Sequence, residues 1–220
     1  MTAFAPHTDP TILLVPGLDN SGPAHWQSLW ERQWLNCHRV DMGNWHTPNR
    51  NAWVNRLNLA IRQTEGPIVL VAHSLGCHAV AWWAALERPH AGGKVAGALL
   101  VAPPEVDNAP ADPRLNSFAP SARGVLPFPS LLVSSRDDPY ISPDRAYRLA
   151  SFWGADHIDA GRAGHINADS DLGDWPFGQR LLARLLDVAE LSGEAGHYPP
   201  APLRRLAARP DRVRVRRVSR

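Results

Sequence analysis

The sequence predicts an α/β protein in which a mostly parallel sheet of about six strands carries helices on both faces. Short, uninterrupted apolar runs alternate along the chain with longer amphipathic segments, as in βαβ units, and no internal repeat interrupts this order. The 220 residues fit one domain, which buries roughly 70% of the surface that its unfolded chain exposes. A core of this size needs no disulfide or structural metal.

The expected strands are continuous apolar runs of the kind found in strands that are buried on both faces. Two of them, the second and the last in the chain, have weaker patterns. In chain order the strands are Thr11–Val15, His38–Asp41, Ile68–Ala72, Val95–Ala102, Ser130–Ser134 and Ala155–Asp159.

The amphipathic segments between these strands are expected to be helices, namely Ala24–Trp34, Ala52–Gln63, Cys77–Glu87, Pro143–Phe152 and Pro176–Leu191. Ser142 followed by Pro143 supplies an N-cap and a proline at the first helical position, and Gly66-Pro67 is expected to end the preceding helix. The segment Pro103–Pro129 is rich in proline and has no sustained period. We expect it to form a long excursion over the carboxyl edge of the sheet, where substrate walls are often built.

A change in composition near Gly193 predicts the end of the domain. Residues 1–192 form the predicted domain, and residues 193–220 form an Arg/Pro-rich, flexible tail. The tail carries eight arginines between Arg204 and Arg220, opposed by Asp211 alone, in a chain of net charge +2. Clustered arginines attract phosphates, so nucleic acid is one interpretation of residues 204–220. A solvated tail is favoured, because no aromatic residues interleave the arginines.

The cysteine count and the apolar runs bear on compartment and cofactors. Two cysteines, Cys37 and Cys77, cannot form a disulfide framework, and no Cys and His residues stand at zinc-site spacing. The segment Met1–Pro10 lacks the pattern of a signal peptide, and no run of ~18 apolar residues occurs. We therefore expect a cytoplasmic protein that binds no metal and no membrane.

A strand–turn–helix pattern surrounds Ser74. The predicted strand Ile68–Ala72 runs into a sharp turn at His73–Gly76, and a helix follows. In a nucleophile elbow the serine occupies a strained turn, so its hydroxyl projects beyond the sheet and small residues are needed two places before and after it. Gly76 meets this need, whereas Ala72 stands where glycine is usual. A serine between small residues also occurs in ordinary turns, so the partner residues decide.

In a hydrolase built on such an elbow, an acid and then a histidine follow the serine, each on a loop after a later strand. The run Ser130–Ser134 leads into Asp137 and Asp138, and the pattern leaves open which of the two is the acid. An Asp before proline also opens ordinary turns. Among the later histidines, His157 lies inside a predicted strand and His197 lies in the tail. Only His165, flanked by Gly164, lies on a loop after a strand, which makes it the candidate general base.

The oxyanion of an acyl-transfer reaction needs two backbone N–H donors. We expect one from Leu75, directly after the nucleophile, and one from Leu18 in the loop after the first strand, where Gly17 permits a tight turn. The glycines of this loop lack the spacing of a dinucleotide site, so no cofactor is predicted. Trp45, in the loop after the second strand, is a candidate wall of an apolar acyl or aromatic pocket, although a packing role is the alternative.

Taken together, these motifs resemble the small serine hydrolases related to retinoblastoma-binding protein nine and their bacterial relatives. The motifs, in order, are Val15-Pro16-Gly17, Ser21-Gly22-Pro23-Ala24-His25-Trp26, Val71-Ala72-His73-Ser74-Leu75-Gly76-Cys77, Ser134-Ser135-Arg136-Asp137-Asp138-Pro139-Tyr140 and Gly164-His165-Ile166-Asn167. The resemblance spans Thr11 to about Leu191. It implies an α/β-hydrolase fold without a cofactor and a Ser74–Asp138–His165 triad. In this family the acid directly precedes the proline, which selects Asp138, and a small residue such as Ala72 is ordinary.

These observations predict a carboxylesterase-like serine hydrolase. Ser74 attacks the acyl carbonyl of a small-molecule ester, His165 moves the proton, and the carboxylate orients the imidazole. Amide or peptide hydrolysis is a variant that the same residues perform. The alternative from another class is a binding or scaffold protein that keeps the fold without turnover. Neither the sequence nor the resemblance identifies the natural substrate or the oligomeric state.

Overall fold

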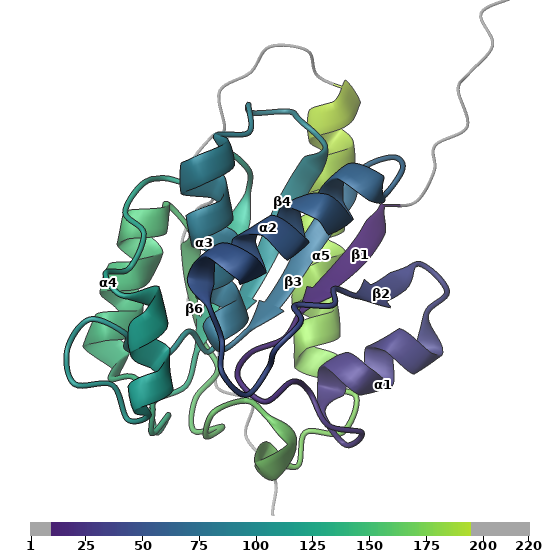
Figure 1. The fold of residues 1–220 in the computed structure, drawn as a ribbon. Helices are drawn as coiled ribbons and strands as arrows, with labels where there is room; N and C mark the ends of the chain where they lie inside the picture. The colour runs from purple at the N-terminus through teal and green to yellow at the C-terminus, as the bar shows by residue number, and fades with distance from the viewer. Residues whose placement is uncertain (1–9, 195–220) are drawn as a thin grey trace, which may run out of the picture.

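The computed structural model describes residues 10–194, and its centre is one sheet of six strands. The strand order is β2-β1-β3-β4-β5-β6, and every neighbouring pair is parallel (Figure 1). The strands are β1 Thr11–Val15, β2 Cys37–Arg39, β3 Ile68–His73, β4 Val95–Val101, β5 Ser130–Ser134 and β6 Asp156–Asp159. The predicted fold class is confirmed, and the sheet is wholly rather than mostly parallel.

Helices cover both faces of this sheet (Figure 1). The α-helices are α1 Trp26–Gln33, α2 Arg50–Gln63, α3 Leu75–Glu87, α4 Pro143–Trp153 and α5 Pro176–Glu194, and two short 3-10 helices are η1 Pro113–Phe118 and η2 Ala168–Ser170. Helices α2, α3 and α4 pack on one face, and α1 and α5 pack on the other. All of the predicted helices are present.

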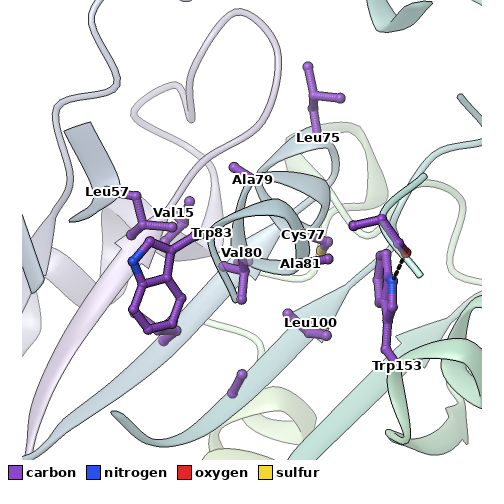
Figure 2. Packing of buried hydrophobic residues seen from close by; sticks show 14 of the residues in the cluster. Val15, Leu57, Leu75, Cys77, Ala79, Val80, Ala81, Trp83, Leu100 and Trp153 are labelled. Atoms are coloured by element: carbon purple, nitrogen blue, oxygen red, sulfur yellow. Dashed lines mark hydrogen bonds between the residues drawn. The ribbon is translucent and has the colours of Figure 1, made fainter. Parts of the chain in front are cut away.

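The two cores reflect the alternation of side chains along the strands. In β1, Leu13 and Val15 face the core under α2, α3 and α4, whereas Ile12 and Leu14 face the core under α1 and α5. Both sets are buried, which is why these strands read as unbroken apolar runs. Figure 2 shows part of the first core, including Trp153, whose indole N–H donates to the carbonyl of Ala122 at 2.9 Å.

Three helices begin at other residues than predicted, and in α1 and α2 a side chain caps the observed start. Helix α1 begins two residues later than expected because His25 is its N-cap and accepts from the N–H of Gln27 at 3.1 Å. Helix α2 begins two residues earlier because Asn49 caps it in the same way. Helix α3 begins at Leu75, directly after Ser74. The excursion predicted at Pro103–Pro129 contains η1, which was not predicted.

Helix α5 continues to Glu194, past the predicted domain boundary near Gly193. The predicted tail, including the arginines of residues 204–220, otherwise lies outside the described residues. Within residues 10–194, no helix is both long enough and apolar enough to cross a bilayer.

Candidate active site

Ser74 occupies the sharp turn between β3 and α3. Its φ is 53° and its ψ is −128°, a conformation that costs a non-glycine residue on the order of 1–3 kcal/mol. Its N–H donates to the carbonyl of Val101 at 2.9 Å, which ties the turn to the end of β4. A Cβ on Gly76 would overlap the carbonyl oxygens of Val15 and Pro16, so the small residue after the serine is required. The turn therefore has the geometry of a nucleophile elbow.

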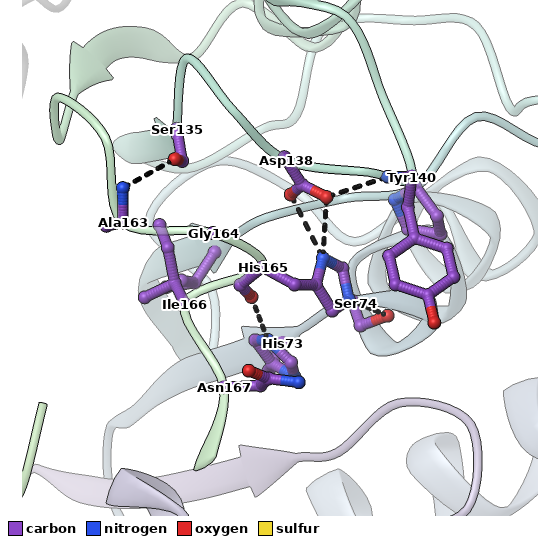
Figure 3. Close-up of polar contacts among 12 residues, drawn as sticks. His73, Ser74, Ser135, Asp138, Tyr140, Ala163, Gly164, His165, Ile166 and Asn167 are labelled. Carbon is purple, nitrogen blue, oxygen red and sulfur yellow. Dashed lines mark hydrogen bonds and ion pairs between the residues drawn. The ribbon is translucent and has the colours of Figure 1, made fainter. Parts of the chain in front are cut away.

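Three side chains from distant parts of the chain meet at this turn (Figure 3). The Nε2 atom of His165 lies 2.9 Å from Oγ of Ser74. Its Nδ1 atom lies 3.0 Å from each carboxylate oxygen of Asp138. The carboxylate is fully buried, and the imidazole is 9% exposed. The arrangement is a continuous chain of hydrogen bonds from a buried carboxylate through an imidazole to a hydroxyl.

Asp137 and Asp138, which the sequence pattern left as alternatives, have different partners. Asp138 faces His165 and also accepts the N–H of Tyr140 at 2.9 Å. Asp137 turns away and accepts from the hydroxyl of Ser135 at 2.8 Å and from the N–H of Gly164 at 2.9 Å. These two donors hold the pKa of Asp137 below its usual value. Asp137 thus braces the loop that carries the histidine without contacting the imidazole.

The two N–H groups predicted to bind an oxyanion belong to segments that meet at Ser74. Gly17 lies so close that a Cβ placed on it would come within 2.6 Å of Cβ of Ser74 and within 3.1 Å of the nitrogen of Leu75. Within residues 10–194, no protein acceptor binds the N–H of Leu18 or that of Leu75. The latter belongs to the first residue of α3, where backbone donors are unpaired and the helix dipole favours negative charge.

Arg39 of β2 holds the loop that follows β1 through hydrogen bonds of its guanidinium. No pattern in the sequence predicts this role. Its guanidinium donates to the side-chain oxygen of Asn20 and to the carbonyl of Ser21, both at 2.8 Å. It also pairs with Glu31 of α1 at 2.8 Å. The loop that contains Leu18 is therefore attached to α1 and β2.

An exposed ionic cluster ties the same loop to the excursion. Arg114 of η1 contacts the carboxylate of Asp19 at 3.1 Å, that of Asp112 at 2.6 Å and the carbonyl of His46 at 3.2 Å. Burial opposes a charged Asp19, but the hydrogen bonds from Arg114 and His46 outweigh it and lower the pKa of this carboxyl. The cluster joins three loops at the carboxyl edge of the sheet.

A cleft of about 430 Å³ lies beside Asp138, between the excursion and the loop after β5. Its walls include Glu105, Ala109, Tyr140, Ile141, Pro143 and Arg145. The ring of Tyr140 lies 4.4 Å from the ring of His165, so this residue borders both the cleft and the imidazole. Trp45 is not part of the cleft wall. It is half-buried, its ring lies 5.7 Å from that of Trp53, and its carbonyl accepts the N–H of Asp19.

Three further histidines are buried in the domain. Burial lowers the pKa of His25 to about 3, that of His78 to about 4, and that of His73 well below its usual value. All three are therefore neutral at neutral pH. Among the described residues, no group of three or more His, Cys, Asp or Glu side chains is placed to hold a metal ion.

Residues 12–184 match a protein family described as serine hydrolase. A structure described as that of a YdeN-like hydrolase from Pectobacterium atrosepticum has 31% sequence identity and a TM-score of 0.73, and the match covers 82% of this chain and 92% of that one. The ydeN gene product from B. subtilis has 21% identity and a TM-score of 0.65, with coverage of 81% and 99%. The carboxylesterase CesB from Bacillus subtilis, at 13% identity and a TM-score of 0.52 with coverage of 81% and 84%, shares the fold. A search of curated proteins finds no match.

Proposed function

The chain belongs to the serine hydrolase family, and from this premise we propose that it hydrolyses small carboxylic esters through an acyl-enzyme on Ser74. The observation that carries the proposal is the hydrogen-bonded chain from Asp138 through His165 to Ser74. A serine hydroxyl is a weak nucleophile on its own, and an adjacent, oriented imidazole is what activates it.

The proposed reaction has two halves that use the same groups. Nε2 of His165 takes the proton of Ser74 as Oγ attacks the acyl carbonyl, and it returns this proton to the leaving alkoxide. Water then loses a proton to the same nitrogen and attacks the acyl-enzyme. The bond between the acyl carbon and Oγ breaks, and the imidazolium returns the proton to Oγ of Ser74 as the carboxylic acid leaves. Asp138 keeps the proton of the neutral ring on Nδ1 and stabilises the imidazolium that forms in each half. Amide bonds are substrates of the same machinery if their leaving group accepts the proton.

The N–H groups of Leu18 and Leu75 are the proposed oxyanion donors. Both belong to segments that lie against Ser74, and neither has a protein acceptor within the described part of the chain. In other hydrolases the loss of one such donor costs about 3 kcal/mol of transition-state stabilisation. Because these donors are backbone N–H groups, no side-chain substitution removes them. They can be tested by a substitution at Gly17, whose small size lets the two segments approach.

We assign the cleft beside Tyr140 and the half-buried ring of Trp45 as the two candidate walls of the substrate site. The cleft of about 430 Å³ falls within the usual range of small-molecule pockets, roughly 300–1,000 Å³. A small acyl compound is thus the proposed partner. A panel of p-nitrophenyl esters of graded chain length, measured for Tyr140→Ala and Trp45→Ala, distinguishes the walls. The variant whose chain-length preference shifts identifies the wall that contacts the acyl group.

Two finer assignments belong to this proposal. The ordered motifs support membership of the subgroup typified by retinoblastoma-binding protein nine. A cytoplasmic location is supported by Cys37 and Cys77, both buried and unpaired. Burial raises the pKa of Cys37 to about 12, so this thiol does not supply a second nucleophile.

The direct test is labelling with a fluorophosphonate probe, with Ser74→Ala as the control. The native protein is expected to label and the variant is not. Aminoacyl-naphthylamides assayed beside the esters separate amidase from esterase activity. Absence of labelling in the native protein, or equal labelling of Ser74→Ala, would overturn the proposal in favour of a binding or scaffold protein with a hydrolase fold.

A further inference from the structure

His73 directly precedes the nucleophile, yet its side chain has no part in the reaction proposed above. The ring is 5% exposed, and its Nε2 atom lies 3.0 Å from the main-chain carbonyl oxygen of His165 (Figure 3). A carbonyl oxygen only accepts hydrogen bonds, so Nε2 of His73 carries the proton and donates it. The residue before the nucleophile thus holds the backbone of the general base.

A second ring donor holds the next carbonyl. The indole N–H of Trp26, in the first turn of α1, donates to the carbonyl of Ile166 at 2.8 Å, and this ring is 1% exposed. Two consecutive carbonyls, those of residues 165 and 166, are therefore fixed from the end of β3 and from α1. Both donors are buried, where a lost partner leaves an unsatisfied polar group.

The backbone that these donors hold is strained. Ile166 has a φ of 50°, which is a genuine outlier for a β-branched side chain, and Gly164 on the other side of the histidine has a φ of 56°. The conformation of Ile166 costs energy and persists only where the surrounding structure holds it, whereas glycine adopts a positive φ readily. The side chain of Ile166 is fully buried, so its packing also helps to fix this backbone conformation. Without the two ring donors, fewer interactions would prevent the backbone of residues 164–166 from relaxing to a conformation in which Ile166 has a negative φ.

We propose that His73 and Trp26 are positioning residues that fix the imidazole of His165 against Ser74. Because His73 is joined to Ser74 by a peptide bond, its hydrogen bond makes the nucleophile and the loop of the general base move together. The hydrogen bond from His73 to the carbonyl of His165 then sets the Nε2 to Oγ distance of 2.9 Å, although the two catalytic residues are 91 positions apart. The inference rests on the proposed serine-hydrolase function.

The surroundings of His73 keep its ring in this role. The ring of His25 packs edge-on against it at 4.6 Å, and that of His165 lies 5.0 Å away. Nδ1 of His25 accepts the N–H of Gln27, so this neighbour carries its proton on Nε2 and presents a neutral ring. Neighbouring aromatic rings and burial leave His73 little freedom to turn, which preserves the direction of its N–H.

The test compares variants that keep or remove the donor. His73→Phe keeps a ring and removes the N–H, whereas His73→Gln places an amide N–H near the position of Nε2. We expect kcat for a p-nitrophenyl ester to fall by about 100-fold in His73→Phe with little change in KM, since a misplacement of 1 Å has an effect of this size. We expect His73→Gln to recover at least a tenth of native kcat. Equal kcat in His73→Phe and native protein, or an equal loss in both variants, would overturn the proposal.

Trp26→Phe and Trp153→Phe form the second, matched pair. Each removes one indole N–H that donates to a carbonyl and the same volume from a ring that is 1% exposed, but Trp153 bonds Ala122, outside the site. Both should lower the unfolding temperature, and only Trp26→Phe should lower kcat, by about tenfold or more. Equal effects on kcat would make the role purely structural. This pair decides the matter if His73→Phe does not fold, and Ser74→Ala labelling tests the function separately.

Discussion

Substituting Gly17 by alanine tests how closely the first loop approaches the nucleophile. The added Cβ would lie 2.6 Å from Cβ of Ser74, whereas two carbon atoms in contact prefer about 3.5–4.0 Å. The loop and the elbow must therefore separate by about 1 Å. Gly17 has no positive φ that would add backbone strain, so the effect comes from this overlap and from the approaches of 3.1 Å to the carbonyl oxygen of His73 and to the nitrogen of Leu75.

A displacement of this size acts on both catalysis and stability. Misplacing catalytic groups by 1 Å costs about 100-fold in rate, equivalent to ~2.7 kcal/mol of transition-state stabilisation. Overpacking a buried site costs about 1–3 kcal/mol of folding free energy, which lowers the melting temperature of a domain of this size by several degrees. We expect kcat/KM to fall further than stability alone explains, because the variant stays folded at the assay temperature.

The matched control is Gly22→Ala in the same loop. A Cβ on Gly22 meets nothing within 4 Å, and its φ is not positive, so stability should stay within ~0.5 kcal/mol and activity should be native. The assay is the rate of fluorophosphonate labelling together with kcat/KM for a p-nitrophenyl ester. If Gly17→Ala labels at the native rate while Ser74 of the native protein reacts, the assigned approach of this loop to the nucleophile is wrong.

Three further predictions concern the acid, the rim and the dependence on pH. Asp138→Asn should lower kcat by about 10⁴-fold because the histidine takes the wrong tautomer, whereas Asp137→Asn should cost less than about tenfold, ~1.4 kcal/mol; similar losses in steady-state assays would refute the assignment of the acid. Arg114→Gln should lower kcat/KM several-fold at low salt and much less at about 1 M salt, because salt screens exposed ion pairs. The control is Arg56→Gln, which breaks an exposed pair with Asp41 away from the site and should have no effect at either salt concentration. Burial lowers the pKa of His78 to about 4 in the folded protein, so the unfolded state binds the proton first; the contribution to stability is complete above about pH 6.5 and is lost as the pH falls toward 4. His78→Gln should flatten the fall in melting temperature over this range, and an unchanged slope would contradict the burial argument.

The sequence predicted the parts of the molecule that depend on local pattern. The strands Thr11–Val15 and Ser130–Ser134 are continuous apolar runs and appear with the bounds expected for them. The edge strand β2 begins one residue earlier and ends two residues earlier than expected, because its pairing with β1 runs from Cys37 to Arg39. The 3-10 helix η1 escaped prediction because a short helix has too few residues to show a period.

The residues of the candidate site were likewise predicted only where a local pattern marks them. Ser74 and His165 were singled out from strand, turn and glycine signals close to them in the chain, but spacing did not separate Asp138 from Asp137. Contacts between segments that are distant in the chain could not be predicted, because they produce no pattern in the neighbouring sequence. The bond from Trp26 to Ile166 spans 140 positions, and the pair of Arg114 with Asp19 spans 95. Only the folded sheet shows which segments meet at its carboxyl edge.

The position of β6 at the end of the sheet leads us to expect that heat inactivation begins locally. Within the described chain this short strand pairs on one side only, with β5, and its residues are half-buried or exposed. Peripheral strands open with a lower free energy than central ones. The loop after β6 carries His165, while Ser74 follows β3 in the centre of the sheet. On warming, we expect fraying of this edge to move the loop of His165, the proposed base, away from Ser74 before the central strands open, so activity should be lost while the circular dichroism of the domain is still native.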